Sequence, residues 1–301
     1  MTTKYKVRKN VKHLTKKERK DFIRAILGLK EKGIYDRYIA WHATAGNFQT
    51  PPGSHRNAAH MGPAFLPWHR EFLLRFEKDL QSIVPGVTIP YWDWTEDAKM
   101  EDPSQSSIWD QDFMGGNGNP EKEFVVDTGP FSVSNWTVID SQGNPSGGLR
   151  RNFGGNERAS TLPTKSDVRN VLKITPYDTS PWDMTSTPSF RNQLEGFING
   201  PQLHNRVHVW VGGHMGSVPV APNDPVFYLH HANVDRIWAI WQVIHPSEGY
   251  YPKEGGPFGQ NLDDPMYPWD TTPKDVMNHR RLKYVYDMEL KKSKRIQLNV
   301  N

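Results

Sequence analysis

Two histidines that lie four residues apart provide the first evidence for a metal site in this sequence. His204 and His208 would lie one turn apart on the same face of a helix, where two imidazoles can bind one metal ion. His42, His69 and His231 each fall within the apolar stripe of an expected helix, and a buried imidazole needs a partner there. A satisfied core histidine is the commoner explanation of one such residue. A shared metal explains several at once, so the pattern favours a metal site.

The surroundings of the remaining histidines predict where each lies. Adjacent helical residues point about 100° apart, so only one of His230 and His231 is expected to face the site. His231 is preferred, because it continues an apolar stripe that includes Phe227 and Trp238. His55 lies between turn residues and is ambiguous. Surface positions are expected for the others, which are His13, His214, His245 and His279.

The scarcity of acidic neighbours favours copper over other metals. Imidazole suits zinc, copper, iron and nickel, whereas a non-haem iron site usually includes a carboxylate. Asp235 follows His231 by four residues, and we expect it to orient an imidazole rather than to bind the ion. The sequence has no HExxH motif. A two-zinc hydrolase is an alternative that metal analysis would distinguish.

Composition excludes several other chemistries. The 301-residue chain has no cysteine, which rules out disulfides, thiolate-bound metals and cysteine nucleophiles. The motifs of serine hydrolases and phosphate-binding loops are also absent. The net charge is +4, and basic residues gather at Lys4–Lys20 and Lys291–Arg295. We interpret both clusters as solvated and expect no nucleic-acid partner.

No apolar segment long enough for a membrane span or a secretory signal occurs in the sequence. We therefore expect no membrane partner. A cytoplasmic location is the default expectation, and secretion stays open because a removed signal leaves no trace.

The elements that would position the histidines form two helical groups. In the first group, Thr15 to Glu18 has the form of a capping box, and its helix should stop at Gly33. A short helix with His42 follows, and a third runs from near Pro67 to just before Pro85.

The second group is expected to begin with a helix capped at Thr187-Pro188. A helix with His204 and His208 follows Gly200-Pro201, and a last one, which carries His231, starts at Asp224-Pro225. The two groups should pack together as one bundle.

Between the two groups lies a long stretch rich in Gly, Pro, Ser and Asn, from Glu96 to Thr185. Phe131 to Asp140 and Leu149 to Phe153 could pair as a hairpin within it. The expected fold is mainly α with long loops and a small β-hairpin or sheet, as a single domain over residues 1–301.

Six short segments match the pattern of one known family: Trp41-His42, Asn57-Ala58-Ala59-His60, Phe65-Leu66-Pro67-Trp68-His69-Arg70, Leu203-His204-Asn205-Arg206-Val207-His208, Asp224-Pro225-Val226-Phe227-Tyr228-Leu229-His230-His231 and Asn233-Val234-Asp235-Arg236-Ile237-Trp238. On these segments the sequence resembles the type-3 copper proteins, and among them the short bacterial tyrosinases of the bacillus type. The likeness covers nearly the whole chain.

The resemblance implies a four-helix bundle around a binuclear copper site, with dioxygen as co-substrate. The family hydroxylates monophenols such as tyrosine at the ortho position and oxidises catechols to ortho-quinones, which leads to melanin-type pigment. The ligands that it implies are His42, His60 and His69 for one copper ion and His204, His208 and His231 for the other. Because no cysteine is present to anchor His60, packing alone must orient that ring.

The resemblance also implies roles for residues around the copper pair. It places a water between Glu195 and Asn205, with Glu195 accepting the phenol proton. The alternative is that Glu195 is a surface helix residue. Val218, in the loop 212–220, would limit the bulk of entering rings. Val209 stands where similar bacterial enzymes often carry a basic residue, which leaves the grip on a substrate carboxylate open.

Met61 and Met184 are weaker candidates for copper entry, because thioethers suit Cu(I), although filling gaps in the core is the commoner role of methionine. Two functional alternatives stay open at this point. One is a catechol oxidase without action on monophenols, and the other is a dioxygen-binding protein. The sequence also leaves open a homodimer and the identity of any partner that delivers copper.

Overall fold

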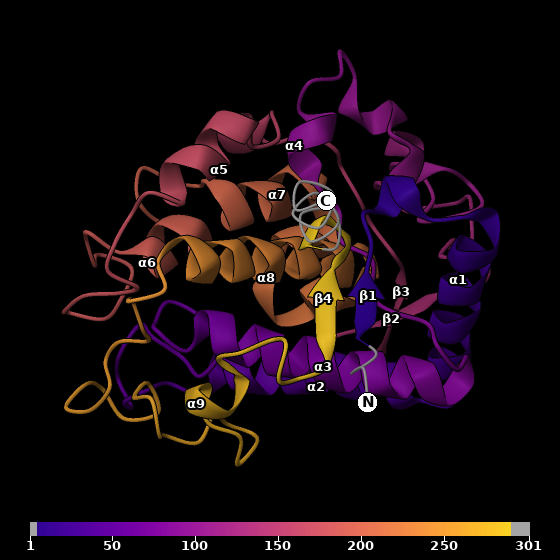
Figure 1. The fold of residues 1–301 in the computed structure, drawn as a ribbon. Helices are drawn as coiled ribbons and strands as arrows, with labels where there is room; N and C mark the ends of the chain where they lie inside the picture. The colour runs from indigo at the N-terminus through magenta and orange to yellow at the C-terminus, as the bar shows by residue number, and fades with distance from the viewer. Residues whose placement is uncertain (1–4, 290–301) are drawn as a thin grey trace, which may run out of the picture.

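Four helices from the two halves of the chain surround the histidines in the computed structural model, which describes residues 5–289 (Figure 1). They are α2 (Ile34–Asn47), α3 (Phe65–Ile83), α7 (Leu203–Val211) and α8 (Val226–Ile244). The first two come from the N-terminal half and the last two from the C-terminal half. Helix α3 packs on α8, and α8 packs on α7. The expected bundle of both helical groups is therefore confirmed.

Local sequence signals set several helix boundaries. Helix α1 (Lys16–Glu31) begins with the expected capping box, in which Thr15 and Glu18 bond reciprocally. Gly33, at φ +67°, separates α1 from α2. At the start of α8, Asp224 accepts a hydrogen bond from the N–H of Val226.

The interface between α3 and α8 is built from aromatic rings. Tyr228 of α8 stacks on Phe76 of α3, with ring centroids 3.5 Å apart. Phe72 of α3 packs edge-on against Phe227, with centroids 5.9 Å apart. Aromatic pairs add about 0.5–1.5 kcal/mol each beyond their buried area. Such rigid packing fixes the distance between the two helices that carry His69 and His231.

Two small sheets complete the fold. Strand β1 (Lys6–Arg8) pairs in parallel with β4 (Tyr284–Tyr286), which brings the two ends of the described chain side by side (Figure 1). Strand β2 (Thr137–Ile139) pairs antiparallel with β3 (Pro145–Gly148). The expected hairpin thus exists, but its second strand lies before residue 149 rather than after it.

A buried ionic network links β1, α3, α8 and β4. The carboxylate of Asp235 on α8 accepts hydrogen bonds from Arg70 at 2.5 Å and from the hydroxyl of Tyr284 at 2.6 Å. Tyr286 and Arg8 complete its partners, the latter at 3.4 Å. Breaking a buried pair on one side costs about 3–5 kcal/mol. This network ties the chain ends to the helix that carries His231.

The irregular middle holds more structure than the sequence predicted. Helix α5 (Lys165–Val171) has a capping box of Thr164 and Asp167, a signal that sequence inspection missed. The helix expected at Thr187-Pro188 instead begins later, as α6 (Phe190–Glu195), because the side chain of Ser189 caps it. The remaining elements are the short helices α4 (Trp94–Asp97) and α9 (Pro273–Val276) and 3-10 turns at Val11–His13, Pro103–Gln105, Ser107–Trp109, Pro120–Lys122, Glu157–Ala159, Gly213–Gly216 and Val218–Asn223.

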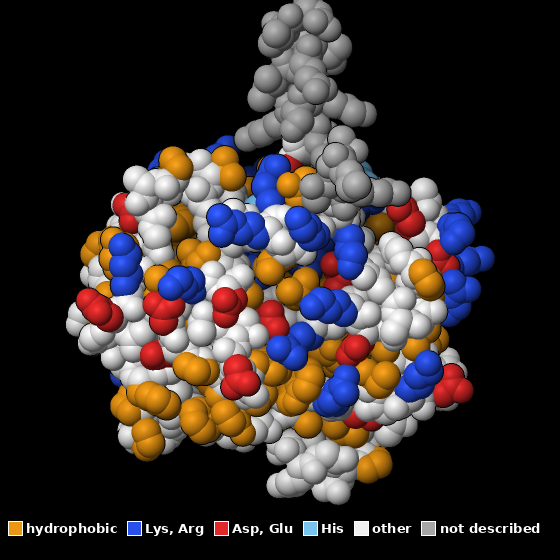
Figure 2. Space-filling view, turned by 60° about the horizontal axis from the view of Figure 1, so that its bottom comes forward, with side chains coloured by type: hydrophobic (Ala, Val, Ile, Leu, Met, Phe, Trp, Pro, Cys, Tyr) orange, Lys and Arg blue, Asp and Glu red, His pale blue; other side chains and the backbone are white. Residues whose placement is uncertain are grey.

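Positive and negative side chains are mixed on the face shown in Figure 2, among scattered apolar ones. The basic cluster 291–295 and Lys4 fall outside the described residues. Among the helices of residues 5–289, none has the length and apolar character needed to cross a membrane.

Candidate metal centre

Three histidines from the N-terminal half form a first buried cluster. His42 comes from α2, His60 from the loop before α3, and His69 from α3 itself. Each offers a ring nitrogen within 4.8 Å of the others. The ring centroids of His42 and His60 are 4.9 Å apart, and those of His60 and His69 are 5.0 Å apart. This spacing suits three ligands around one ion.

A second cluster brings together four histidines of the C-terminal half, His204, His208, His230 and His231. The Nε2 atom of His231 lies 3.3 Å from the Nε2 atoms of both His204 and His208. A single hydrogen on His231 could serve only one of these contacts. One metal ion would serve all three nitrogens.

The two clusters are adjacent. The ring of His69 stacks on that of His231, with centroids 4.3 Å apart and planes tilted by 13°. His69 also lies near His204, at 6.5 Å between centroids. The structure thus places the six histidines expected as ligands around one centre, as a binuclear site requires.

In His69 and His208, hydrogen bonds determine which ring nitrogen is free to bind a metal. The Nδ1 atom of His69 lies 2.8 Å from the carbonyl of Phe65, and that of His208 lies 2.7 Å from the carbonyl of Met215. A carbonyl only accepts, so each Nδ1 must carry the hydrogen. Nε2 is then unprotonated and able to bind a metal.

The donor set fits copper. Ring nitrogens without a partner in the described chain include both nitrogens of His42, Nδ1 of His60 and Nε2 of His69, although buried polar atoms normally find one. Burial lowers the pKa of all seven clustered histidines, to about 4 for His208. Neutral imidazoles without a carboxylate among them suit copper better than non-haem iron.

His230 corrects the expectation that only one of the two adjacent histidines could face the site. It is fully buried, and its ring stacks on that of His204 with centroids 5.1 Å apart. His231 contacts the same His204 ring from its edge, at 4.8 Å. Because the two side chains flank one ring from two directions, both fit despite their angular separation. The convergence of three Nε2 atoms still favours His231 as the ligand.

A cavity of about 360 Å³ opens beside the histidines. Its lining includes His42, His60, His204 and His208, and five more of the residues singled out from the sequence: Met61, Glu195, Asn205, Val209 and Val218. Val218 is 46% exposed and stands at the mouth. The volume is in the usual range for a site that takes a small ligand.

Glu195 is not the surface residue that one interpretation allowed, since it is only 1% exposed. Its Oε1 accepts a hydrogen bond of 2.7 Å from the N–H of Met61, and its Oε2 accepts one of 3.0 Å from Arg191. Arg191 also donates to Asp178 at 2.8 Å. Burial, opposed by the charge of Arg191, raises the pKa of Glu195 to about 7. The carboxyl can therefore take or release a proton near neutral pH.

Asn205 contacts a histidine directly. Its Oδ1 lies 3.0 Å from Nδ1 of His204, and the carbonyl of Glu195 lies 3.2 Å from the same nitrogen. Both acceptors hold the hydrogen on Nδ1 and leave Nε2 free. The backbone carbonyl of Glu195 and the side chain of Asn205 thus contact the same imidazole, and both residues line the cavity.

The expectation about Asp235 as a supporting residue is wrong. Asp235 does not orient an imidazole, because Arg70, Arg8, Tyr284 and Tyr286 occupy its carboxylate. Nδ1 of His231 has no hydrogen-bond partner in the described chain.

Met184 lies outside the cavity lining, and its carbonyl accepts a hydrogen bond from Asn192, so its part in copper entry stays a prediction. Met215, which the sequence analysis passed over, does line the cavity, and its carbonyl fixes His208. No spacing signal marked it.

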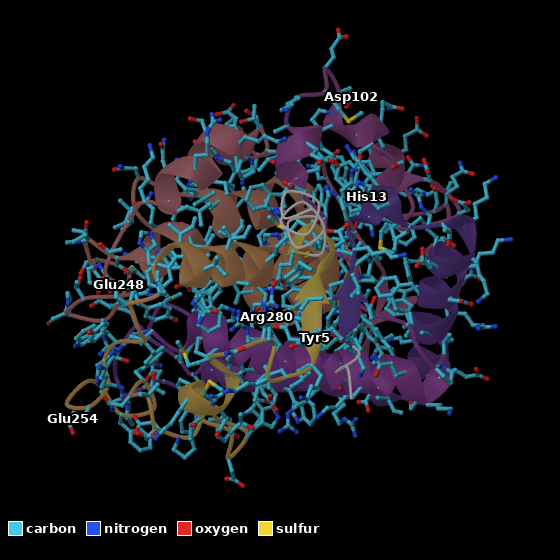
Figure 3. All side chains as sticks on the ribbon, in the orientation of Figure 1. Tyr5, His13, Asp102, Glu248, Glu254 and Arg280 are labelled. Carbon is cyan, nitrogen blue, oxygen red and sulfur yellow. The ribbon has the colours of Figure 1, made fainter. Side chains whose placement is uncertain are left out.

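The histidines expected at the surface differ in how far they are exposed. His13, labelled in Figure 3, is exposed and pairs with Asp287 at 2.9 Å. His55 is exposed as well. His279 is only 5% exposed and bonds to Glu289, so its surface assignment is wrong. His214 and His245 are partly buried and bond to backbone groups of other segments.

The loop after α7 is fixed by close backbone contact. Gly213 has φ +51°, and a Cβ there would lie 2.0 Å from the carbonyl oxygen of Arg150. Only glycine fits such an approach. The N–H of His214 donates to the same carbonyl at 3.1 Å. The segment that carries Met215 and Val218 over the cavity is therefore anchored.

The helical bundle and its two adjacent groups of imidazoles define a type-3 copper protein. The family model described as "Common central domain of tyrosinase" matches residues 32–244. A tyrosinase of Streptomyces glaucescens is 44% identical over 289 residues, which cover 94% of this chain and 99% of that protein. The chain belongs to the tyrosinase family.

Other relatives place the chain more broadly. Grixazone synthase of Streptomyces griseus is 39% identical over 93% of this chain and 99% of its own length. A polyphenol oxidase from Thermothelomyces thermophila shares the fold, with a TM-score of 0.69 at 24% identity over 93% of this chain and 87% of that one. Deoxygenated hemocyanin of Rapana thomasiana matches with a TM-score of 0.61 at 25% identity, over 94% and 70% of the two chains.

Proposed function

We propose that this protein is a tyrosinase that uses two copper ions and dioxygen to hydroxylate monophenols at the ortho position and to oxidise catechols to ortho-quinones. The observation that carries the proposal is the meeting of two buried imidazole clusters beside an open cavity. Family membership over nearly the full length supports it. The bound copper pair would supply the redox chemistry that activates dioxygen.

We assign the ligands as His42, His60 and His69 for one ion and His204, His208 and His231 for the other. The free Nε2 atoms of His69 and His208 support this assignment. His60 sits in a loop, but Asn57 holds that loop by accepting hydrogen bonds from the N–H groups of Ala59 and His60. Packing against His42 and His69 then sets the direction of its ring.

The cavity would hold the phenol ring and keep bulk water from its reacting edge. Met61, Val209 and Val218 offer apolar walls, and the histidines form the floor. Val218 at the mouth limits the bulk of the ring that can enter. A thioether at Met61, beside His60, also suits transfer of Cu(I) into the site.

Proton removal is the step that the chain itself must arrange. A phenol has a pKa near ~10 and is mostly protonated at neutral pH. Glu195, with its pKa raised to about 7, would accept this proton through a water held together with Asn205. Arg191 fixes the carboxylate from behind, and its own pairing with Asp178 keeps it in place.

Anaerobic copper loading followed by air tests the proposal. We expect two copper ions per chain, a new near-ultraviolet absorption band on admitting air, and quinone formation from both tyrosine and catechol. Catechol oxidation without action on tyrosine would establish a catechol oxidase instead. Reversible oxygen uptake without quinone would establish a dioxygen-binding protein, and a preference for zinc would contradict the proposal. Sedimentation of the loaded protein distinguishes a monomer from the homodimer that the sequence leaves open.

The Glu195→Gln variant tests the proton acceptor. The amide keeps the size of the carboxyl but cannot take the proton, so we expect monophenol hydroxylation to fall by about 10²-fold or more. Catechol oxidation should fall far less. Equal losses for both substrates would contradict the role, and unchanged copper content serves as the control for folding.

A further inference from the structure

A single cationic side chain lies at the rim of the cavity. Among the described residues that line the cavity, Arg158 is the only Lys or Arg, and its side chain is exposed. It belongs to the 3-10 turn Glu157–Ala159. Val209 lines the same cavity from α7 and is apolar. Position 209 of α7 therefore offers no charge to the cavity, whereas Arg158 does.

The turn that carries Arg158 packs on α7, and the segment just before the turn is hydrogen-bonded to that helix. The N–H of Asn152 donates to the carbonyl of Val211 at 2.9 Å, and that of Gly154 donates to Trp210 at 2.7 Å. The ring of Phe153 stacks on that of Trp210, with centroids 5.0 Å apart. The same helix holds His204 and His208. The position of Arg158 is thus fixed relative to the metal centre.

The turn itself is also capped. The side chain of Asn156 accepts a hydrogen bond of 3.0 Å from the N–H of Arg158. The N–H of Ala159 donates to the carbonyl of Asn156 at 3.0 Å, and the side chain of Ala159 is buried. These contacts hold the backbone of Arg158 and leave its long side chain free to reach a ligand.

Arg158 differs from neighbouring arginines in its charge pairing. Arg150 pairs with Glu123 at 2.7 Å, Arg151 with Asp224 at 2.7 Å, and Arg191 with Asp178 at 2.8 Å. Within residues 5–289, no acidic side chain forms an ion pair with Arg158. A guanidinium presents several donors in a planar fork that matches a carboxylate. An unpaired one beside a ligand cavity is available for an anion.

We propose that Arg158 binds the carboxylate of phenols that carry an acidic side chain, while the ring points toward the histidines. The proposal rests on the proposed function and names the substrate class that this site prefers. It locates the charge recognition on the 3-10 turn that carries Arg158 rather than at Val209 of α7.

Steady-state kinetics with three phenols of similar size test the proposal. The probes are 3-(4-hydroxyphenyl)propionate as the anion, 4-ethylphenol as the neutral compound and tyramine as the cation. In the Arg158→Gln variant, loaded with copper, we expect kcat/KM for the anion to fall about five- to tenfold, mostly through KM. The neutral phenol should change less than about twofold. In Arg158→Glu the order of anion and cation should reverse.

A matched control is Arg169→Gln, because Arg169 is exposed on α5 and lies outside the cavity lining. It removes the same charge from the same chain, so it corrects for a general change in the electrostatic field. The preference for the anion should also weaken as salt is raised in the unaltered protein, and this salt dependence should be smaller in Arg158→Gln.

Losses of equal size for all three phenols, or an unchanged ratio of anion to neutral phenol, would overturn the role of Arg158. An equal effect of Arg169→Gln would overturn it too. Normal oxidation of 4-ethylphenol with no charge preference would leave the proposed function standing and remove only this inference. Failure of the copper-loaded, unaltered protein to oxidise any phenol or catechol would remove both.

Discussion

The two histidine clusters differ in how firmly the protein itself orients the rings. In the second cluster, the carbonyl of Met215 fixes Nδ1 of His208, and Asn205 fixes Nδ1 of His204. In the first cluster only His69 has such a partner. The carbonyls of Val218 and Pro219 approach the ring of His42, but neither of its nitrogens makes a well-aligned hydrogen bond, and Nδ1 of His60 makes none within the described chain. Acceptors on the far ring nitrogen raise metal affinity and hold ring direction. Two of the three expected ligands of the second cluster have such a partner, since Nδ1 of His231 has none among residues 5–289, against one of the three in the first cluster. The second cluster is therefore better prepared for its ion than the first.

The largest expected effects come from removing one ligand from each cluster. In both His42→Ala and His208→Ala we expect one copper ion per chain and a loss of catechol oxidation of at least about a hundredfold, the upper end for loss of a supporting residue. The ion that remains in His42→Ala should resist a chelator longer than the one in His208→Ala. Metal analysis after dialysis against graded chelator measures this. Equal retention in the two variants would contradict the proposed difference.

Acid should destabilise the metal-free protein strongly. Burial lowers the pKa values of the seven clustered histidines. Each histidine therefore adds to the free energy of unfolding above its unfolded pKa of about 6.5, and this contribution is lost as the pH falls toward the folded pKa. For His208, whose pKa falls to about 4, the difference amounts to roughly 3 kcal/mol. Glu195, with a raised pKa, acts in the opposite direction between about 4.5 and 7.

Because seven imidazoles oppose one carboxyl, we expect the free energy of unfolding of the metal-free protein to rise steeply with pH from 4 to 6.5. Urea unfolding at several pH values measures the slope. Addition of copper above pH 6.5 should then raise the midpoint further. A free energy of unfolding that stays flat over this range would show that the rings are not buried in their neutral form.

A smaller effect separates His230 from His231. In His230→Phe we expect two copper ions per chain to be retained, because the three converging Nε2 atoms belong to His204, His208 and His231. Activity should fall by about tenfold, since the ring that stacks on His204 changes its size and polarity. Copper content and catechol turnover, measured on one preparation, decide the matter. Loss of one copper would make His230 the ligand.

The smallest expected effect is at the mouth of the cavity. In Val218→Phe we expect kcat/KM for bulky catechols to fall a few-fold more than that for catechol itself, because the larger aromatic side chain narrows the mouth of the cavity. Stability should change little, because the residue is 46% exposed. Equal losses for large and small substrates would contradict the role of Val218 in limiting substrate size.

The positions of the helices were predictable where local signals and tertiary packing agreed. The capping box at Thr15 and the stripe through Phe72 and Phe76 both lie on helices whose extents the sequence anticipated. The start of α6 was missed because Ser189 is a better cap than the Thr187-Pro188 pair. The parallel pairing of β1 with β4 joins residues almost a whole chain apart, and no local pattern encodes such contacts.

The site could be predicted as a set of residue types but not as a network. Helical spacing indicated His204 and His208, and the stripes indicated His42, His69 and His231. The partner of Asp235 could not be read from the sequence, because Arg8, Arg70 and two tyrosines reach it from three other elements. The ion pair of Arg191 with Glu195 is a similar case. Its i,i+4 spacing can be seen in the sequence, but its burial cannot.

The anchoring of α8 has a consequence for how the enzyme is made. Asp235 is held by Arg8 from the first strand and by Tyr284 and Tyr286 from the last, so these contacts are complete only after almost the entire chain has left the ribosome. During synthesis, His204, His208 and His231 emerge well before that final strand. Until then His231 lies on a helix whose contacts with the two strands have not yet formed. Metallation should therefore follow translation, and a nascent chain stalled before residue 284 should capture copper poorly.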